Sequence, residues 1–143
     1  MTKTYYEQLS DLNVDFFERA KISLLDPLGL YLANDVKWIK TNQNWNYLKF
    51  PVVIGGKGQP ILLLHGFDSS FLEFRRIYQS LKRNFQVIIP DLLGFGFSPR
   101  CAVNEYNPSK IISYLVDLLK TLKIKENLKI IGASMGGSTA LKL

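Results

Sequence analysis

The chain has 143 residues, of which 47% are hydrophobic, and this is enough for one modest core. Its formal net charge is +6, but the basic residues form no run and are not interleaved with aromatic residues, which argues against a nucleic-acid-binding protein. No apolar run approaches 18 residues and no leader peptide is evident, so neither a membrane span nor secretion is expected. Cys101 is the only cysteine and excludes an internal disulfide, so we expect a cytoplasmic protein.

Residues 1–44 are expected to form an N-terminal helical extension. Residues 1–36 carry six acidic and three basic residues, a net −3 that leaves +9 for the remainder. Apolar residues recur at helical spacing and indicate an amphipathic helix: Val14, Phe17, Ala20 and Leu24. Asp26 and Pro27 are typical of the start of a second short helix, which we expect to run to about residue 39. The first helix lacks the Lys/Arg-rich polar face of membrane-surface helices, so packing against the rest of the chain is favoured.

Residues 45–143 are expected to form the main domain, which begins with a β-rich segment. Residues 45–54 are aromatic and β-branched and are typical of a hairpin strand leading into residues 61–64. Pro51 has no backbone N–H, which predicts an edge position or a bulge for this strand.

Strands and helices then alternate. Short apolar runs, each ending in a Gly-containing turn, predict buried strands at residues 61–64, 86–89 and 128–133. Ser70 and Glu73 have capping-box spacing and predict a helix over residues 71–82, and Asn107-Pro108 begins another helix with one apolar stripe. This alternation predicts an α/β fold with a mostly parallel sheet flanked by helices and right-handed crossovers.

The third predicted strand ends in a turn that carries one serine. Gly132-x-Ser134-x-Gly136 has the spacing of a nucleophile elbow, in which flanking glycines remove Cβ atoms that would clash at a sharp turn. A Ser-Gly cluster between a strand and a helix is also an ordinary loop, so the motif alone leaves both interpretations open. The elbow predicts a positive φ at Ser134, a strained conformation for a residue other than glycine.

Three turns together resemble those of the α/β-hydrolase family. They are His65-Gly66-Phe67, Asp91-x-x-Gly94-x-Gly96-x-Ser98 and Gly132-x-Ser134-x-Gly136-Gly137, each after a predicted strand. They occur in the family's order over about residues 48–143. The resemblance implies the N-terminal half of an α/β-hydrolase fold, incomplete because the chain stops just after the elbow.

By this resemblance, Ser134 is the candidate catalytic nucleophile, and the oxyanion hole consists of the backbone N–H groups of Phe67 and Met135. His65 is the only histidine, but in the family the base follows the acid and the acid follows the serine, so His65 is in the wrong position for the base. Asp91 also precedes the serine, and we expect its carboxylate to brace a turn by accepting backbone hydrogen bonds.

No cofactor or metal is indicated by the sequence. The Gly94-Phe95-Gly96 turn lacks the third glycine of a dinucleotide fingerprint, and there is no Walker A lysine or metal-ligand cluster. The resemblance therefore implies a serine hydrolase acting on a small ester or related acyl substrate. Esterase, thioesterase, carbon–carbon hydrolase and perhydrolase chemistry stay open.

The nine residues after Ser134 include no Asp, Glu or His, so neither later member of a catalytic triad is present in them. We therefore expect a truncated or split hydrolase that is inactive alone. A C-terminal partner fragment would complete the sheet. The alternative is a non-catalytic remnant or interaction module that keeps the first half of the fold.

Overall fold

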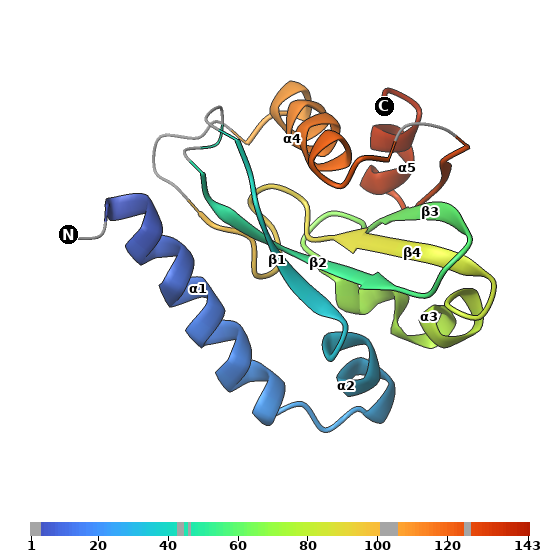
Figure 1. The fold of residues 1–143 in the computed structure, drawn as a ribbon, viewed down its shortest axis with the longest axis horizontal. Helices are drawn as coiled ribbons and strands as arrows, with labels where there is room; N and C mark the ends of the chain where they lie inside the picture. The colour runs from blue at the N-terminus through green and yellow to red at the C-terminus, as the bar shows by residue number, and fades with distance from the viewer. Residues whose placement is uncertain (1–3, 43–44, 46, 101–105, 125–126) are drawn as a thin grey trace.

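The computed structural model describes residues 4–42, 45, 47–100, 106–124 and 127–143. Five strands form one sheet in the order β1-β2-β4-β3-β5, with helices on both faces (Figure 1). The elements follow along the chain as α1 (Tyr5–Ile22), α2 (Pro27–Ala33), β1 (Val36–Lys40), β2 (Lys49–Gly55), β3 (Gln59–Leu64), the 3₁₀-helix η2 (Phe71–Phe74), α3 (Arg75–Leu81), β4 (Phe85–Pro90), α4 (Pro108–Thr121), β5 (Lys129–Gly132) and α5 (Met135–Ala140).

The predicted parallel sheet is confirmed in its C-terminal three strands. β3 lies between β4 and β5 and is parallel to both, with Ile61 opposite Val87 and Leu62 opposite Ile130. β1 and β2 are antiparallel to their neighbours, so the sheet is mixed. Because β3 and β5 are adjacent and parallel, the turns that follow them meet at the same edge of the sheet.

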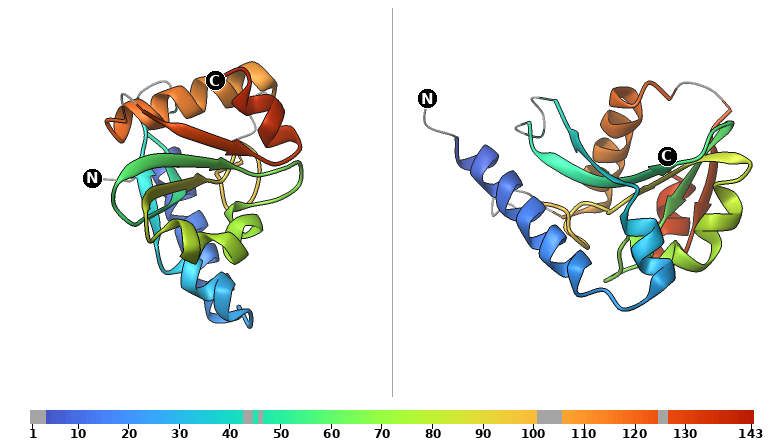
Figure 2. Two further views of the ribbon diagram at one scale, coloured as in Figure 1. Left: turned by 90° about the vertical axis from the view of Figure 1, so that its right-hand side faces the viewer. Right: turned by 60° about the horizontal axis from the view of Figure 1, so that its bottom comes forward.

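Alternating side chains of the strands fill two cores, one on each face of the sheet. Leu62 and Leu64 pack with Tyr114 and Leu118 beneath α4, whereas Ile61 and Leu63 point to the opposite face. The second core also holds side chains of three helices: Phe17 of α1, Leu32 of α2 and Tyr78 of α3. Figure 2 shows the helices on either side of the sheet. Burial on both faces accounts for the nearly continuous apolar runs of β3 and β4.

The N-terminal segment packs against the sheet, as predicted, but its second helix is shorter than predicted. Helix α2 ends at Ala33, and Val36–Lys40 forms β1, so the expectation that the second helix runs to about residue 39 is wrong. Three of the five residues of β1 are β-branched or aromatic, and its backbone pairs with β2 along its whole length. The pairing joins residues on either side of position 44, and a domain division there stays a prediction.

Of the two alternatives predicted from Pro51, an edge position or a bulge, the edge position is wrong. Strand β2 lies between β1 and β4, and it is not paired with β3, so the expected hairpin into β3 does not form. Pro51 is tolerated because it lies where the β2–β4 ladder ends. Its carbonyl accepts the Asp91 amide at 3.2 Å, and the Asp91 carbonyl accepts the Ser98 hydroxyl at 3.0 Å in place of a proline N–H.

Both helix starts predicted after residue 61 are found. Ser70 caps η2 by accepting the Leu72 amide at 3.3 Å, and the helical segment continues through α3 to Leu81. Asn107 caps α4 by accepting the Lys110 amide at 2.9 Å. The capping box at Ser70 is only half formed, because the Glu73 carboxylate accepts the Gly66 amide instead.

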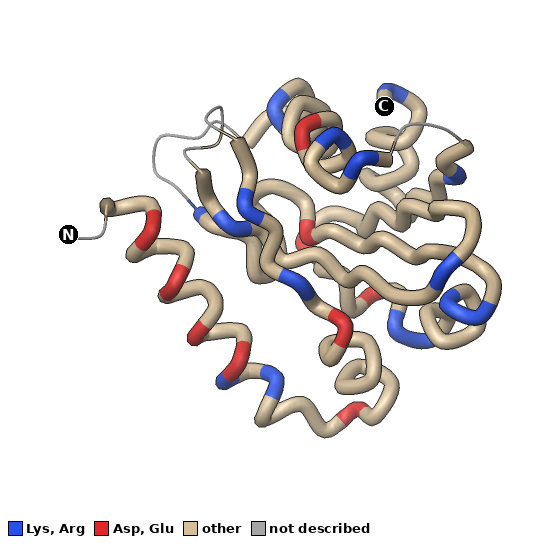
Figure 3. Tube along the Cα trace, in the orientation of Figure 1, with Lys and Arg blue, Asp and Glu red and all other residues tan. Residues whose placement is uncertain are grey.

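Acidic residues line α1, and basic residues predominate over the sheet and the later helices (Figure 3). Ion pairs join the two parts: Lys49 with Asp11 at 3.4 Å, Arg75 with Asp26 at 2.5 Å, and Lys82 with Asp35. The opposite charges of the N-terminal segment and the remainder therefore meet within the fold. Across the described ranges, no helix combines the length and apolar character that crossing a membrane requires. Cys101 lies outside the described residues.

Candidate active site

Ser134 lies at a sharp turn between β5 and α5. Its φ of 50° and ψ of −115° are strained for a residue with a side chain, and the predicted positive φ is confirmed. The Ser134 side chain is exposed and does not cap α5. The hydroxyl is therefore presented to solvent rather than used to hold the backbone.

Two glycines allow this turn to press against the sheet. A Cβ on Gly132 would lie 2.3 Å from the Gly136 carbonyl atoms, and a Cβ on Gly136 would lie 2.0 Å from the Leu64 oxygen. Both contacts are with backbone, which cannot move aside as a flexible side chain can. The glycines of the motif thus have the steric role that the sequence pattern predicts.

The turn after β3 lies beside Ser134. The Ala133 amide donates to the Leu64 carbonyl at 2.9 Å, and a Cβ on Gly66 would lie 3.5 Å from the Ser134 Cβ. Phe67 follows directly, so the two segments named for the oxyanion hole are brought together. Considering only the described residues, the amides of Phe67 and Met135 donate to no protein acceptor. Both amides are therefore available to a ligand.

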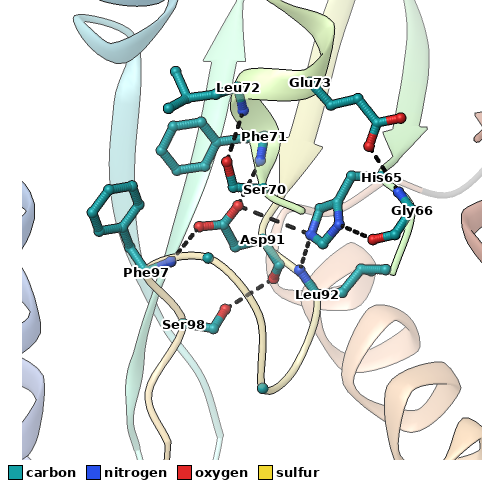
Figure 4. Close-up of polar contacts among 12 residues, drawn as sticks. His65, Gly66, Ser70, Phe71, Leu72, Glu73, Asp91, Leu92, Phe97 and Ser98 are labelled. Atoms are coloured by element: carbon teal, nitrogen blue, oxygen red, sulfur yellow. Dashed lines mark hydrogen bonds and ion pairs between the residues drawn. The ribbon is translucent and has the colours of Figure 1, made fainter. Parts of the chain in front are cut away.

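The His65 ring orients the turn after β3. Its Nδ1 donates to the Gly66 carbonyl at 2.8 Å, and its Nε2 accepts the Leu92 amide at 2.9 Å (Figure 4). The Gly66 carbonyl and the Phe67 N–H belong to one trans peptide and point in opposite directions. Fixing the carbonyl therefore fixes the direction of the Phe67 N–H. With both nitrogens engaged and the ring buried, His65 has no free position from which to act as a base.

Burial lowers the pKa of His65 below its ordinary value, and the Leu92 N–H opposite Nε2 also favours the neutral ring. The unfolded chain binds a proton at this residue below about pH 6.5, whereas the folded chain resists doing so. This contribution to stability is full above that pH and is lost as the pH falls.

We expect the free energy of unfolding to fall between pH 7 and pH 5 by up to about 2 kcal/mol more in the wild type than in His65→Gln. Urea unfolding at the two pH values measures this difference. Asp91 contributes with the opposite sign in both proteins, so the comparison isolates the histidine. An equal change in the two proteins, or a change toward lower stability at pH 5 that is larger in His65→Gln than in the wild type, would contradict a neutral buried ring.

The Asp91 carboxylate braces two loops, and this expectation is confirmed. Its two oxygens accept the Phe71 amide at 2.6 Å and the Phe97 amide at 2.7 Å (Figure 4). Burial raises the pKa of Asp91 to about 7, although these two hydrogen bonds oppose the rise. Its Oδ1 is 4.0 Å from His65 Nε2, which carries no proton in the tautomer described above, so the contact is not an ion pair.

Two contributors to this site were missed from the sequence. The Leu92 amide sets the His65 tautomer, and the Glu73 carboxylate holds the Gly66 amide at 2.8 Å. Leu92 acts through its backbone, for which side-chain patterns give no signal. Glu73 was assigned to a helix cap, and only the proximity of Gly66 in the fold shows its other partner.

An open groove of about 800 Å³ borders the turns after β3 and β4. Helix α1 forms one wall with Phe16 and Ala20, and Glu73 lies at the side nearest Gly66. The remaining lining is both apolar and charged: Asp68, Ser69, Ser70, Leu72, Arg75, Gly96, Phe97 and Arg100. Ser134, Phe67 and Met135 are not among its lining residues.

Comparison with known proteins places these features in a family. Residues 59–143 match the family model described as the alpha/beta hydrolase fold. The chain is 37% identical over 89 residues to 2-hydroxy-6-oxo-6-(2'-aminophenyl)hexa-2,4-dienoic acid hydrolase of Metapseudomonas resinovorans, covering 60% of this chain and 30% of that protein. It is also 37% identical over 84 residues to Lipase 1 of Psychrobacter immobilis, covering 59% of this chain and 26% of the lipase.

Solved structures show the same similarity. A meta-cleavage product hydrolase from Pseudomonas fluorescens superposes with a TM-score of 0.67 at 27% identity, covering 74% of this chain and 38% of that one. An alpha/beta hydrolase fold protein from Burkholderia ambifaria superposes with a TM-score of 0.61 at 29% identity, covering 66% of this chain and 34% of that one. The chain thus spans about a third of the length of these proteins.

Proposed function

The chain belongs to the α/β-hydrolase fold family, and on that premise we propose that it is the nucleophile-bearing part of a serine hydrolase acting on an ester or related acyl compound. The observation that carries the proposal is the exposed Ser134 in a strained strand-to-helix turn. Strain of about 1–3 kcal/mol persists only where the surroundings enforce it, and such positions cluster at active sites. Relatives named as hydrolases and lipases support the same reaction class.

In the proposed mechanism, the Ser134 hydroxyl attacks the substrate carbonyl. The carbonyl oxygen of the substrate becomes negatively charged and accepts hydrogen bonds from the Phe67 and Met135 amides. These amides have no other acceptor within the described part of the chain. A base must take the serine proton, because a hydroxyl is a weak nucleophile without one. No Asp, Glu or His lies in residues 135–143, so we propose that the acid and the histidine come from outside these 143 residues.

The edge of the sheet offers a place for that missing part. β5 is paired with β3 on one side only among the described strands, and Ile131 of β5 is 43% exposed. Leu141, just after α5, is 91% exposed. An unpaired apolar edge favours pairing with another strand, so we propose that the C-terminal part adds strands beside β5. The one cysteine supports the cytoplasm as the compartment.

A fused protein tests this proposal. It consists of residues 1–143 followed by the part of the M. resinovorans hydrolase that lies beyond its 89 matched residues, and we call it the completed enzyme. We expect it to hydrolyse p-nitrophenyl butyrate at least about 100-fold faster than residues 1–143 alone, because it adds the acid and the base. Initial rates at equal concentration measure the difference.

The alternative function is an interaction module without turnover. A completed enzyme that folds, as judged by circular dichroism and a cooperative melting transition, but shows no ester hydrolysis would favour that module. Turnover by residues 1–143 alone at the rate of the completed enzyme would contradict the proposed origin of the acid and base.

A further inference from the structure

Glu73 contacts the turn that carries one of the two proposed oxyanion donors. Its Oε2 accepts the Gly66 amide at 2.8 Å (Figure 4). A Cβ built on Gly66 would lie 3.7 Å from this Oε2 and 3.5 Å from the Ser134 Cβ. The Glu73 carboxylate and the Ser134 side chain therefore both lie close to the same side of Gly66. The Glu73 side chain is more than a third exposed, so it makes this contact without being confined by burial.

Two side chains hold Gly66 from its two sides. Glu73 accepts the Gly66 N–H, and His65 donates to the Gly66 carbonyl at 2.8 Å. The carbonyl shares its peptide plane with the Phe67 N–H, so a rotation of Gly66 about either backbone bond would turn that N–H away. A glycine has no side chain to limit such rotation, and its backbone freedom must be limited by contacts.

The helix start gives a second reason to assign a role to this contact. Ser70 caps η2, and the capping-box pattern would direct the Glu73 carboxylate back to the Ser70 amide. At the N-terminus of α1, Thr4 and Glu7 do form both bonds of such a box. Glu73 binds the Gly66 amide instead, at a distance typical of a charge-assisted bond.

We propose that Glu73 is a positioning residue for the oxyanion hole, acting through the Gly66 amide to hold the Phe67 N–H toward the developing oxyanion. This inference rests on the proposed function. Glu73 makes no bond to the reacting atoms. Its carboxylate limits the rotation of Gly66, and the His65 ring limits it from the other side.

Kinetics of the completed enzyme test the proposal. We expect Glu73→Ala to lower kcat for p-nitrophenyl butyrate by about tenfold or more and to change KM less than twofold, because a loosened donor weakens the transition state more than substrate binding. Glu73→Gln keeps an acceptor oxygen at the same length and should restore most of kcat. Arg76→Ala, an exposed truncation on the neighbouring helix α3, should leave both constants unchanged.

Inhibition by butylboronic acid separates positioning from general stability. Its tetrahedral adduct places an oxygen in the oxyanion hole, so the inhibition constant should rise with the loss of kcat in Glu73→Ala and recover in Glu73→Gln. Equal kcat in Glu73→Ala and wild type, or equal losses in the Ala and Gln variants, would overturn the proposal. If Ser134→Ala also retained turnover, the proposed function itself would fail, and the two failures are thereby distinguished.

Discussion

Ser134→Ala in the completed enzyme is expected to lower kcat for ester hydrolysis by about 10⁴-fold or more. Loss of the nucleophile leaves only the acceleration from binding and the oxyanion hole, which is typically ~10³–10⁴-fold over water. KM should change little, because the hydroxyl is exposed and makes no contact that shapes the turn. Initial-rate kinetics against p-nitrophenyl butyrate measure both constants.

Ser138→Ala is the matched control for this change. Ser138 lies one helical turn after Ser134, is also exposed, and loses the same hydroxyl on mutation. It should retain wild-type kcat and KM. Comparable losses in both variants would mean that α5 is disturbed, and full activity in Ser134→Ala would remove Ser134 from the reaction.

Gly136→Ala is expected to destabilise the fold by about 3 kcal/mol or more, at the upper end of the range for overpacked sites. The new Cβ would lie 2.0 Å from the Leu64 oxygen, 2.6 Å from the Leu64 carbonyl carbon and 2.7 Å from the His65 oxygen. All three are backbone atoms at the end of β3, so relief requires α5 to move away from the sheet. The change in free energy can be measured by urea unfolding.

Gly137→Ala controls for the general effect of alanine in this helix. A Cβ at Gly137 would meet only the Gly132 carbonyl, with its oxygen at 3.3 Å. The gain in helix propensity, about 1 kcal/mol, offsets that contact, so its stability should stay within about 1 kcal/mol of the wild type. If the two variants were equally stable, α5 would not be pressed against β3 as described.

The parts of the fold that could be predicted are those with strong local patterns. The run before His65-Gly66 is apolar over its whole length, and burial of β3 on both faces of the sheet is the physical reason. The turn at Ser134 was predicted because its glycine spacing is a local pattern, and the requirement for Gly132 arises from contacts with Gly136 and Gly137, within five residues. A steric requirement between residues that are close in sequence can be predicted without knowledge of the rest of the fold.

The parts that could not be predicted depend on contacts between distant residues. Strand β1 was assigned to a helix, because Asp26-Pro27 starts a helix clearly and no glycine or proline marks its end near Ala33. Its pairing with β2 overrides that tendency. Pro51 likewise indicated an edge, but the Ser98 hydroxyl supplies the missing donor from 47 positions later in the chain.

The same limit applies to the candidate site. Ser134 and Phe67 could be named from the motifs, and the pairing of β3 with β5 places their segments side by side. The hydrogen bonds that orient the site could not, because Leu92 and Glu73 reach it through the folding of other turns. The motifs therefore predicted the residues of the proposed reaction, and only the structure shows that Leu92 and Glu73 orient them.

The most direct measurement is a crystal structure of the completed enzyme after reaction with a fluorophosphonate. We predict phosphorus bonded to the Ser134 Oγ, with the phosphonyl oxygen about 3 Å from the amides of both Phe67 and Met135. An adduct on any other residue, or a phosphonyl oxygen directed away from these two amides, would contradict the assignment of this turn as the catalytic centre.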